Sequence, residues 1–514
     1  MIRRTAWANL EKRFFYPGNT TTLTFANGTT VEKPNIARFH FGPYDWNNVK
    51  DAESMHKEFC RGAYDNGSSS PARRSMKSVH RTTAPDSIYS LPKPHMSLAV
   101  RQQEPSKING YPEPVLITDD QVVSGYFLDE PGFEDVAVLV LLSFDSDFVS
   151  FQSAVQTFFD KAVAAGKTKL VIDVQANGGG TILQGYDTFR QIFPDIVQDG
   201  PSRWRLTSTF DALSMTFSPI CGNYTPKANE NQELDAPCNT VNNWRNDLNV
   251  TNGRFTSYAD KFGPMTVSGD SYTNYMQWDP ANVVLTRLSF GTDITGYGHR
   301  TNFTRPFGGP ENIVLLYDGY CASTCTIFSQ FMKHDAGVKS IAMGGRPREG
   351  LIQGVGGVKG SQVYPFTQLA ALGELASLYT EDEKLLKELK KLNDSYVTSR
   401  SPHPQGAVNV RDAVLPDELD EGVPTQFITE LADCRLYWTE PMLKDAGEIW
   451  KAAAQAAFKG GKCAAGGIER PTQRPLFSSF RAPRYRKHPK PVRSGKTLPP
   501  DSPIMQYMRV KVSD

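Results

Sequence analysis

Four short aliphatic runs constrain the fold of this chain more than any other feature. Each run has the length of a strand, and they cover Asp135 to Ser143, Lys169 to Val174, Ile313 to Leu316 and Ser340 to Met343. Continuous apolar runs of this length are typical of parallel strands covered on both faces. Apolar residues at helical spacing follow the first three runs, over Phe148 to Ala165, Ile182 to Phe193 and Ile327 to Met332. Strands that alternate with helices predict an α/β fold made of βαβ units with a mostly parallel sheet.

The chain divides into three parts around this core. Residues 1–114 are rich in loops, residues 115–465 hold the alternating units, and residues 466–514 are rich in Pro, Arg and Lys. Within the middle part, residues 194–311 interrupt the alternation with Pro, Asn, Trp and Tyr, which predicts a long insertion. A second helical block is expected over Gln368 to Leu392.

The last part of the chain differs from the rest in charge. Residues 466–514 carry 11 Lys or Arg and 3 Asp or Glu, a net charge of +8, so the remaining body carries −7 of the total of +1. This asymmetry is typical of a basic tail on an acidic protein. Because the tail has no regular aromatic interleaving, we expect it to be disordered and not to bind nucleic acid.

Two features favour an extracellular setting. Seven N-x-S/T sequons are present, at Asn19, Asn27, Asn66, Asn223, Asn249, Asn302 and Asn393. Seven cysteines are present. Cys221 and Cys238 are one candidate pair, Cys434 and Cys463 are another, and Cys60 is the best candidate for an unpaired thiol, but the sequence leaves the connectivity open. Met1 to Gly18 has no apolar signal-peptide region, so we expect the true N-terminus to be missing from this chain. No apolar run is long enough to cross a membrane.

The turn after the third strand carries the first candidate for chemistry. Asp318 and Gly319 end the strand, and a run of small residues from Cys321 to Cys325 places Ser323 at the start of a helix. Free N–H groups at a helix start favour developing negative charge, which suits a serine nucleophile. The alternative is that the Ser323 hydroxyl only caps the helix.

The turn after the second strand carries the other candidate. Asn177 is followed by Gly178, Gly179 and Gly180, and this turn and the serine turn both follow strands of one sheet, where α/β folds place their sites. A phosphate cradle is disfavoured, because the spacing is not G-x-G-x-x-G and no P-loop Lys follows. Glycine backbone can approach a substrate carbonyl and donate an N–H to it, as in an oxyanion hole. A plain tight turn between strand and helix is the alternative.

These two turns carry a resemblance to a known family. Leu170 to Gly180 (LVIDVQANGGG) resembles the I-D-x-R-x-N-G-G-G turn of the tail-specific, or C-terminal-processing, serine peptidases, and Val314 to Phe328 resembles their nucleophile turn. The C-A-S-x-C form, with Val408 to Asp412 (VNVRD) and Ala432 to Thr439 (ADCRLYWT), is most similar to the secreted fungal group, which resembles the chlamydial protease-like activity factor. The resemblance is strong over about 115–345 and weaker to about 458.

The resemblance implies both a fold and a site. It implies a crotonase/ClpP-like βαβ spiral core, with a partial PDZ-like module in residues 1–114 ahead of it. It implies endopeptidase activity without a metal or other cofactor. On this carry-over Ser323 is the nucleophile, and Gly178 or Gly179, together with Thr324, donates to the oxyanion.

The general base is where the sequence departs from the family. Bacterial members use the Lys of a K-G-x-x-Q turn, and here Glu349 stands in the Lys position of a turn that ends in Gln353. The chlamydial type uses a His from a D-G-H-like segment, oriented by a later Glu, for which Glu381 lies at about the right distance. No D-G-H is present, and all eight histidines lack its context: His40, His56, His80, His95, His299, His334, His403 and His488.

The sequence therefore predicts a secreted serine-type endopeptidase that forms an acyl-enzyme on Ser323, with an oxyanion hole from the Asn177 to Gly180 turn. The expected partner is a peptide or protein substrate, and no cofactor, metal, nucleic acid or membrane is expected. The oligomeric state is left open. The alternative is a pseudo-peptidase, or a binding protein on the same fold such as the interphotoreceptor retinoid-binding proteins, because a serine without a base is a weak nucleophile.

Overall fold

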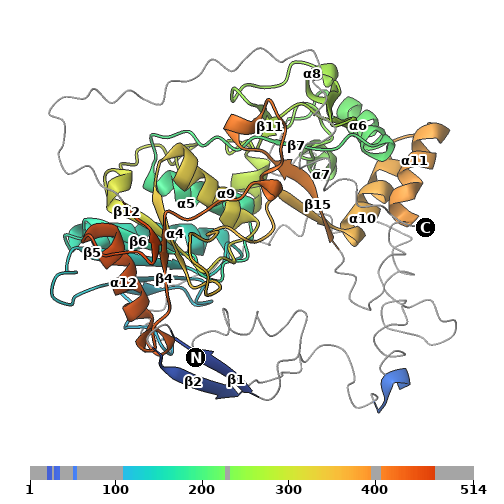
Figure 1. Ribbon diagram of the computed structural model, residues 1–514. Coiled ribbons are helices and arrows are strands. Elements are labelled where there is room, and N and C mark those ends of the chain that lie inside the picture. Colours follow the sequence, from blue (N-terminus) through green and yellow to red (C-terminus); the bar gives the residue numbers. More distant parts are fainter. Residues whose placement is uncertain are drawn as a thin grey trace.

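The computed structural model (Figure 1) describes residues 20–25, 28–34, 50–54, 108–225, 232–394 and 407–468, and its larger sheet is a mixed sheet of eight strands. The strand order is β17-β16-β13-β12-β6-β5-β4-β3. The bounds are β3 Leu116–Ile117, β4 Val123–Phe127, β5 Val136–Leu141, β6 Lys169–Asp173, β12 Ile313–Tyr317, β13 Lys339–Met343, β16 Cys434–Leu436 and β17 Ala465–Gly466. Strands β5, β6, β12, β13 and β16 are parallel, and β3, β4 and β17 run antiparallel to their neighbours. The predicted α/β class and the four predicted strands are confirmed, within one or two residues at each end.

Three helices cover one face of this sheet. They are α4 Phe148–Ala164, α5 Ile182–Ile192 and α9 Thr324–Gln330, and α9 continues as a π-helical turn over Phe331–Asp335. Alternate strand residues, such as Leu139, Ile172 and Leu315, pack against them in the larger core cluster. The parallel strands joined by α4 and by α9 are immediate neighbours, so their carboxyl ends lie along one edge of the sheet.

The last helix, α12 Ala446–Phe458, covers the opposite face of the same strands. Its Trp450 is fully buried, and its ring lies 4.7 Å from Tyr126 and 5.6 Å from Tyr111 between ring centroids. The intervening strand residues, such as Val138 and Val171, point to this side. Burial on both faces explains why these strands are apolar without alternation.

A second sheet lies at the other end of the molecule (Figure 1), with strand order β14-β15-β7-β11-β8. Its bounds are β7 Ser202–Arg203, β8 Leu248–Asn249, β11 Met276–Gln277, β14 Gln362–Pro365 and β15 Ala407–Ala413. The helices around it are α6 Ser208–Ile220, α7 Gln232–Cys238, α8 Tyr258–Phe262, α10 Phe366–Ser377 and α11 Glu383–Asp394. The predicted insertion, residues 194–311, thus shares a sheet with strands that come after the core, and together they bury a third apolar cluster.

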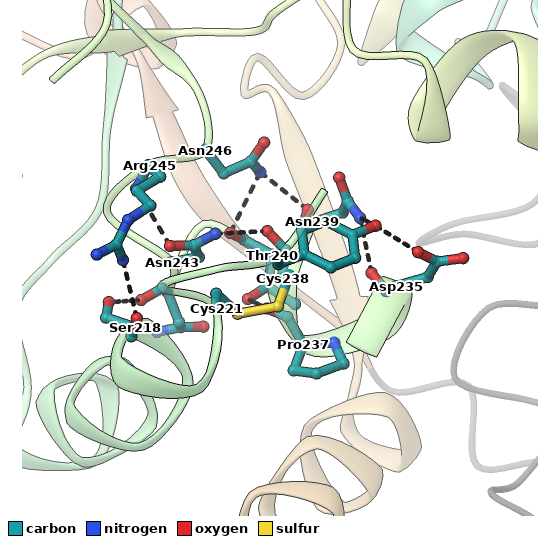
Figure 2. The surroundings of a disulfide bond; sticks show 12 residues. Ser218, Cys221, Asp235, Pro237, Cys238, Asn239, Thr240, Asn243, Arg245 and Asn246 are labelled. Atoms are coloured by element: carbon teal, nitrogen blue, oxygen red, sulfur yellow. Dashed lines mark hydrogen bonds between the residues drawn. A yellow bond between two sulfur atoms is a disulfide. The ribbon is translucent and has the colours of Figure 1, made fainter. Parts of the chain in front are cut away.

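The disulfide Cys221–Cys238 joins the ends of α6 and α7 within this second region (Figure 2). Polar side chains surround it, since Asn243 donates to the Cys238 carbonyl at 2.8 Å and Arg245 donates to the Ser218 carbonyl at 2.9 Å. Cys434–Cys463 joins β16 to the chain that precedes β17. Both candidate pairs are confirmed, and Cys60 lies outside the described residues.

Other predictions fare differently. The helical block expected over Gln368 to Leu392 is two helices, α10 and α11, with a break at residues 378–382. Near the N-terminus the described residues include a hairpin of β1 Thr20–Thr24 and β2 Thr30–Pro34. A short hairpin of β9 Met265–Val267 and β10 Asp270–Tyr272 lies within the insertion.

The PDZ-like module and the crotonase/ClpP-like spiral stay predictions, and all but the first three residues of the predicted tail lie outside the described residues.

Candidate active site

The glycine turn and the serine turn meet at the carboxyl ends of two neighbouring strands. Strands β6 and β12 pair in parallel with Asp173 opposite Leu316, so the residues that follow them emerge side by side. The Ala322 N–H donates to the Asn177 carbonyl at 3.1 Å, and the Thr324 hydroxyl donates to the Gly180 carbonyl at 2.6 Å. Two segments more than 140 residues apart in the chain are therefore fixed against each other.

Ser323 has a backbone conformation that side-chain-bearing residues rarely adopt. Its φ is +53° and its ψ is −122°, and such a conformation costs about 1–3 kcal/mol unless the surroundings impose it. The surroundings hold it firmly, because its N–H donates to the Val358 carbonyl at 2.6 Å and its carbonyl accepts the N–H of Thr326 at 2.8 Å. Ser323 occupies the N-cap position of α9, yet its side chain makes no capping hydrogen bond, so the capping interpretation is wrong.

The Ser323 hydroxyl is available for chemistry. The residue is half-buried, and its Oγ makes no hydrogen bond to any of the described residues. A strained serine with an unengaged hydroxyl at a strand–helix turn is the arrangement expected of a nucleophile.

The glycine turn is shaped by the side chain of Asn177. This fully buried amide donates to the Leu141 carbonyl at 3.0 Å and accepts the Gly179 N–H at 2.8 Å. The Gly179 N–H is thus engaged within the turn. In contrast, the N–H groups of Gly178 and Thr324 have no acceptor among the described residues.

Gly179 contributes to the site by having no side chain. Its φ is +96°, and a Cβ there would lie 2.6 Å from the Ser323 Cβ, 2.7 Å from the Ala322 carbonyl oxygen and 2.8 Å from the Thr324 nitrogen. Two of these three atoms are backbone, so no rotamer change could relieve the clash. The close approach of the two turns therefore requires glycine at this position.

Two carboxyl groups support the turns: Asp173, which is buried, and Asp318, which is half-buried. Asp318 accepts the N–H of Ala176 and the N–H of Tyr320, both at 2.9 Å, and so bridges the two turns. Asp173 accepts the N–H of Gln175 at 2.9 Å and the indole N–H of Trp450 at 2.8 Å. Burial raises the pKa of both carboxyls, to about 6 for Asp173, whose pKa the charge on Asp318 also raises. Neither residue is among the predicted site residues, although each stands at the end of an aliphatic run.

A third disulfide encloses the candidate nucleophile. Cys321 and Cys325, 5.4 Å apart between Cα atoms, are bonded across Ala322, Ser323 and Thr324, and both are fully buried. This pair is not among the disulfides expected from the sequence, in which the two cysteines stand out only as small residues of the turn. Their i, i+4 spacing was the available signal, because residues four apart face each other at a helix start.

The candidates for a general base do not reach Ser323. His334 stands eleven residues after Ser323, on the order of 16 Å along a helix, and its Nε2 lies 3.6 Å from Glu430. His299 is the other described histidine, and its backbone N–H donates to the Asp293 carboxylate at 2.9 Å. The remaining six histidines lie outside the described residues.

The acidic and amide candidates are exposed. Glu349 and Gln353 lie on the surface, with Gln353 bridged to Leu431, and Glu381 lies in the break before α11 and not inside a helix as expected. Lys359, one residue past the Val358 that pairs with Ser323, is buried in an ion pair with Glu430 at 2.6 Å. Its ammonium is therefore committed to Glu430.

Two further kinds of site were sought in the described part of the chain. No group of three or more His, Cys, Asp or Glu residues there is arranged to hold a metal ion. No helix there has the length and apolar character needed to cross a bilayer.

The sequence is similar to two fungal relatives. It is 30% identical over 500 residues to the peptidase S41 family protein phomP1 of Diaporthe leptostromiformis, covering 88% of this chain and 69% of that protein. It is 32% identical over 395 residues to the peptidase S41 family protein ustP of Aspergillus flavus, covering 72% of this chain and 80% of that protein. No protein-family model matches the sequence.

The chain is also similar to solved structures, at a lower level. The crystal structure of mature CPAF aligns at 12% identity over 66% of this chain and 55% of that chain, with a TM-score of 0.35. The photosystem II D1 C-terminal processing protease aligns at 13% identity over 65% and 53%, with a TM-score of 0.27. Scores this low carry no conclusion about the site.

Proposed function

The chain belongs to the peptidase S41 family of serine-type peptidases, and from that premise we propose that it is an endopeptidase that forms an acyl-enzyme on Ser323. The observation that carries this proposal is the backbone of Ser323. A residue held at positive φ, with its hydroxyl unengaged and a glycine turn packed against it, is hard to explain as a structural serine. Backbone strain of this kind is typical of a nucleophile whose side chain must be held in one orientation.

In the proposed reaction the Ser323 Oγ attacks the carbonyl carbon of the scissile peptide bond. The carbonyl oxygen gains negative charge, and the N–H groups of Gly178 and Thr324 are the proposed donors to it, because both lack an acceptor in the described structure. Gly179 is assigned a different role from the one first expected, since its N–H serves Asn177. Its lack of a Cβ lets the two donors approach one another.

The mechanism also requires proton transfer. The Ser323 hydroxyl proton passes to a general base, which then protonates the leaving amine; water hydrolyses the resulting ester and regenerates the hydroxyl. No described residue is placed to accept this proton. The base is left unassigned, and individual His→Ala variants of the histidines outside the described residues, His40, His56, His80, His95, His403 and His488, test whether one of them serves as the base.

We further propose that the protein works in an oxidising compartment as a glycoprotein. All six cysteines of the described residues form disulfides, which persist in secreted proteins. Asn223 and Asn302, each in a sequon, are exposed. A mass decrease on treatment with a peptide N-glycosidase, smaller in the double variant Asn223→Gln/Asn302→Gln than in the wild type, tests this assignment.

A fluorophosphonate probe tests the nucleophile. The probe should label the wild-type protein on one serine, and mass spectrometry of the labelled peptide should identify Ser323. Ser323→Ala should abolish labelling, whereas Ser150→Ala, on the exposed face of α4, should leave its rate unchanged. Absence of labelling in the wild-type protein, or equal labelling of Ser323→Ala, would reject the proposal in favour of a binding protein.

A further inference from the structure

The disulfide Cys321–Cys325 is placed around the one residue whose orientation matters most for the proposed reaction. It joins the turn after β12 to the first turn of α9 and closes a ring of chain that contains Ser323 and its neighbours Ala322 and Thr324. Thr324 is the residue whose N–H is proposed to stabilise the oxyanion. Both the attacking group and one donor therefore lie inside the same covalent ring.

The ring completes a set of constraints on Ser323. Hydrogen bonds hold the turn from two sides. On one side the Ala322 N–H donates to the Asn177 carbonyl. On the other the Ser323 N–H donates to the Val358 carbonyl, and the Gly357 N–H donates to the Cys321 carbonyl. Across the turn itself, the Cys325 N–H donates to the Ala322 carbonyl at 3.0 Å. The disulfide adds a covalent link over the same stretch, because it joins the residue two before Ser323 to the residue two after it.

A general contribution to stability does not explain this bond well. A disulfide stabilises a protein chiefly by restricting the unfolded chain, and the effect grows with the length of the loop it closes. Cys321–Cys325 spans 4 residues, against 17 for Cys221–Cys238 and 29 for Cys434–Cys463. It restricts the unfolded chain least of the three, so its main effect is expected where it sits.

We propose that the Cys321–Cys325 disulfide is a positioning device that holds Ser323 and the Thr324 N–H in the geometry for acylation. The inference rests on the proposed function. It follows that the peptidase acts fully only after this bond has formed, which links activity to an oxidising compartment. Displacement of reacting groups by about 1 Å lowers rates by about 100-fold, so loss of the bond should reduce acylation strongly.

The test compares two disulfide-free variants of the same chain. Cys321→Ala/Cys325→Ala removes the bond around Ser323, and Cys221→Ala/Cys238→Ala removes a bond in the second region as the matched control. Saturation kinetics with a fluorophosphonate separate the affinity for the probe from the rate constant of acylation. We expect the rate constant to fall about 10- to 100-fold in the first variant with little change in affinity, and the control to behave as wild type. Equal rate constants in the first variant and the wild type would overturn the proposal.

A second measurement keeps the inference separate from the proposed function. Hydrogen–deuterium exchange should rise in the peptide that covers residues 319–330 in Cys321→Ala/Cys325→Ala, with little change elsewhere. If the wild-type protein is not labelled by the probe, the endopeptidase proposal fails, and unchanged exchange would then reject the positioning role on its own evidence. A further outcome would also contradict the positioning role: both Cys321→Ala/Cys325→Ala and Cys321→Ala/Cys325→Val fail to fold while the control variant folds. The disulfide would then be needed for the stability of the whole protein.

Discussion

Gly179 is the residue at which the two turns leave no space for a side chain. In Gly179→Ala the new methyl group would meet the Ser323 Cβ and two backbone atoms at 2.6–2.8 Å, so one turn must move. We expect the rate of Ser323 labelling by a fluorophosphonate to fall at least about 100-fold. Gly132→Ala is the matched control, because Gly132 has a similar φ of +90° and nothing within 4 Å of a Cβ. It should cost about 1 kcal/mol of stability and leave labelling intact, and equal labelling of both variants would contradict the account.

At the scale of single residues, Asp173 should also make the stability of the protein depend on pH. Burial raises the pKa of its carboxyl to about 6 from an ordinary 3.8. Between about pH 4 and pH 6 the folded protein therefore holds a proton that the unfolded chain has released. Stability falls as the pH rises through this window, by up to about 3 kcal/mol.

The variant Asp173→Asn removes this titration and keeps an acceptor for one of the two N–H donors. We expect its melting temperature, relative to wild type, to be higher at pH 7 than at pH 4. Thermal unfolding at several values of pH between these limits measures the difference. Parallel profiles for the two proteins would show that Asp173 does not titrate in this range.

At the scale of elements, α12 supports the site from the far face of the sheet. Its Trp450 fills the space between the strands and the aromatic pair Tyr111 and Tyr126, and its indole N–H bonds the Asp173 carboxyl. One side chain thus couples the packing of α12 to the end of β6, where the glycine turn begins.

Two substitutions of Trp450 separate packing from hydrogen bonding. Trp450→Ala should lower the free energy of unfolding by about 3–5 kcal/mol, because it leaves a cavity in a fully buried position. Trp450→Phe retains a ring and loses the donor to Asp173, so about 1–3 kcal/mol is expected. Urea unfolding measures both, and a loss in Trp450→Phe as large as in Trp450→Ala would assign the effect to the hydrogen bond alone.

At the scale of the whole molecule, a buried charge cluster ties the insertion to the later part of the chain. Asp247, just before β8, accepts from Lys261 of α8 at 2.8 Å and from Arg411 of β15 at 3.0 Å, and all three side chains are almost fully buried. Burial alone would raise the pKa of Asp247, but the charges of Lys261 and Arg411 outweigh it and hold that pKa below its ordinary value.

Removing the carboxylate should be costly, because two buried cations would lose their counter-charge. We expect Asp247→Asn to destabilise the protein by about 3–5 kcal/mol near neutral pH. The loss should shrink only as the pH falls below the ordinary carboxyl pKa of 3.8 and through the lowered pKa of Asp247, where the wild-type carboxylate is protonated and its pairing is lost. Asp270→Asn is the control: its pair with Arg205 is exposed, so chemical denaturation should show a change below about 1 kcal/mol.

Much of the core could be read from the sequence. The aliphatic runs predicted the positions of β5, β6, β12 and β13, because a strand buried on both faces appears in the sequence as a nearly continuous apolar run. The second sheet could not be read in this way. Its strands β7, β8 and β11 have two residues each, and they share the sheet with β14 and β15, which follow the core strand β12 and helix α9 in the chain.

The candidate site, like the fold, could be predicted from the sequence only in part. The sequence by itself determined which residues stand at the turns: Ser323 after β12, and Asn177 to Gly180 after β6. Residue order and local periodicity are enough for that. Only the tertiary structure decided what each residue does there, because backbone angles, burial and contacts across more than 140 residues depend on how the strands pair. In the folded chain Ser323 has a positive φ and its side chain does not cap the helix, and the Gly179 N–H donates to Asn177. Asp318 and Asp173 accept hydrogen bonds from the backbone of the turns. Cys321 and Cys325 form a disulfide on either side of the serine.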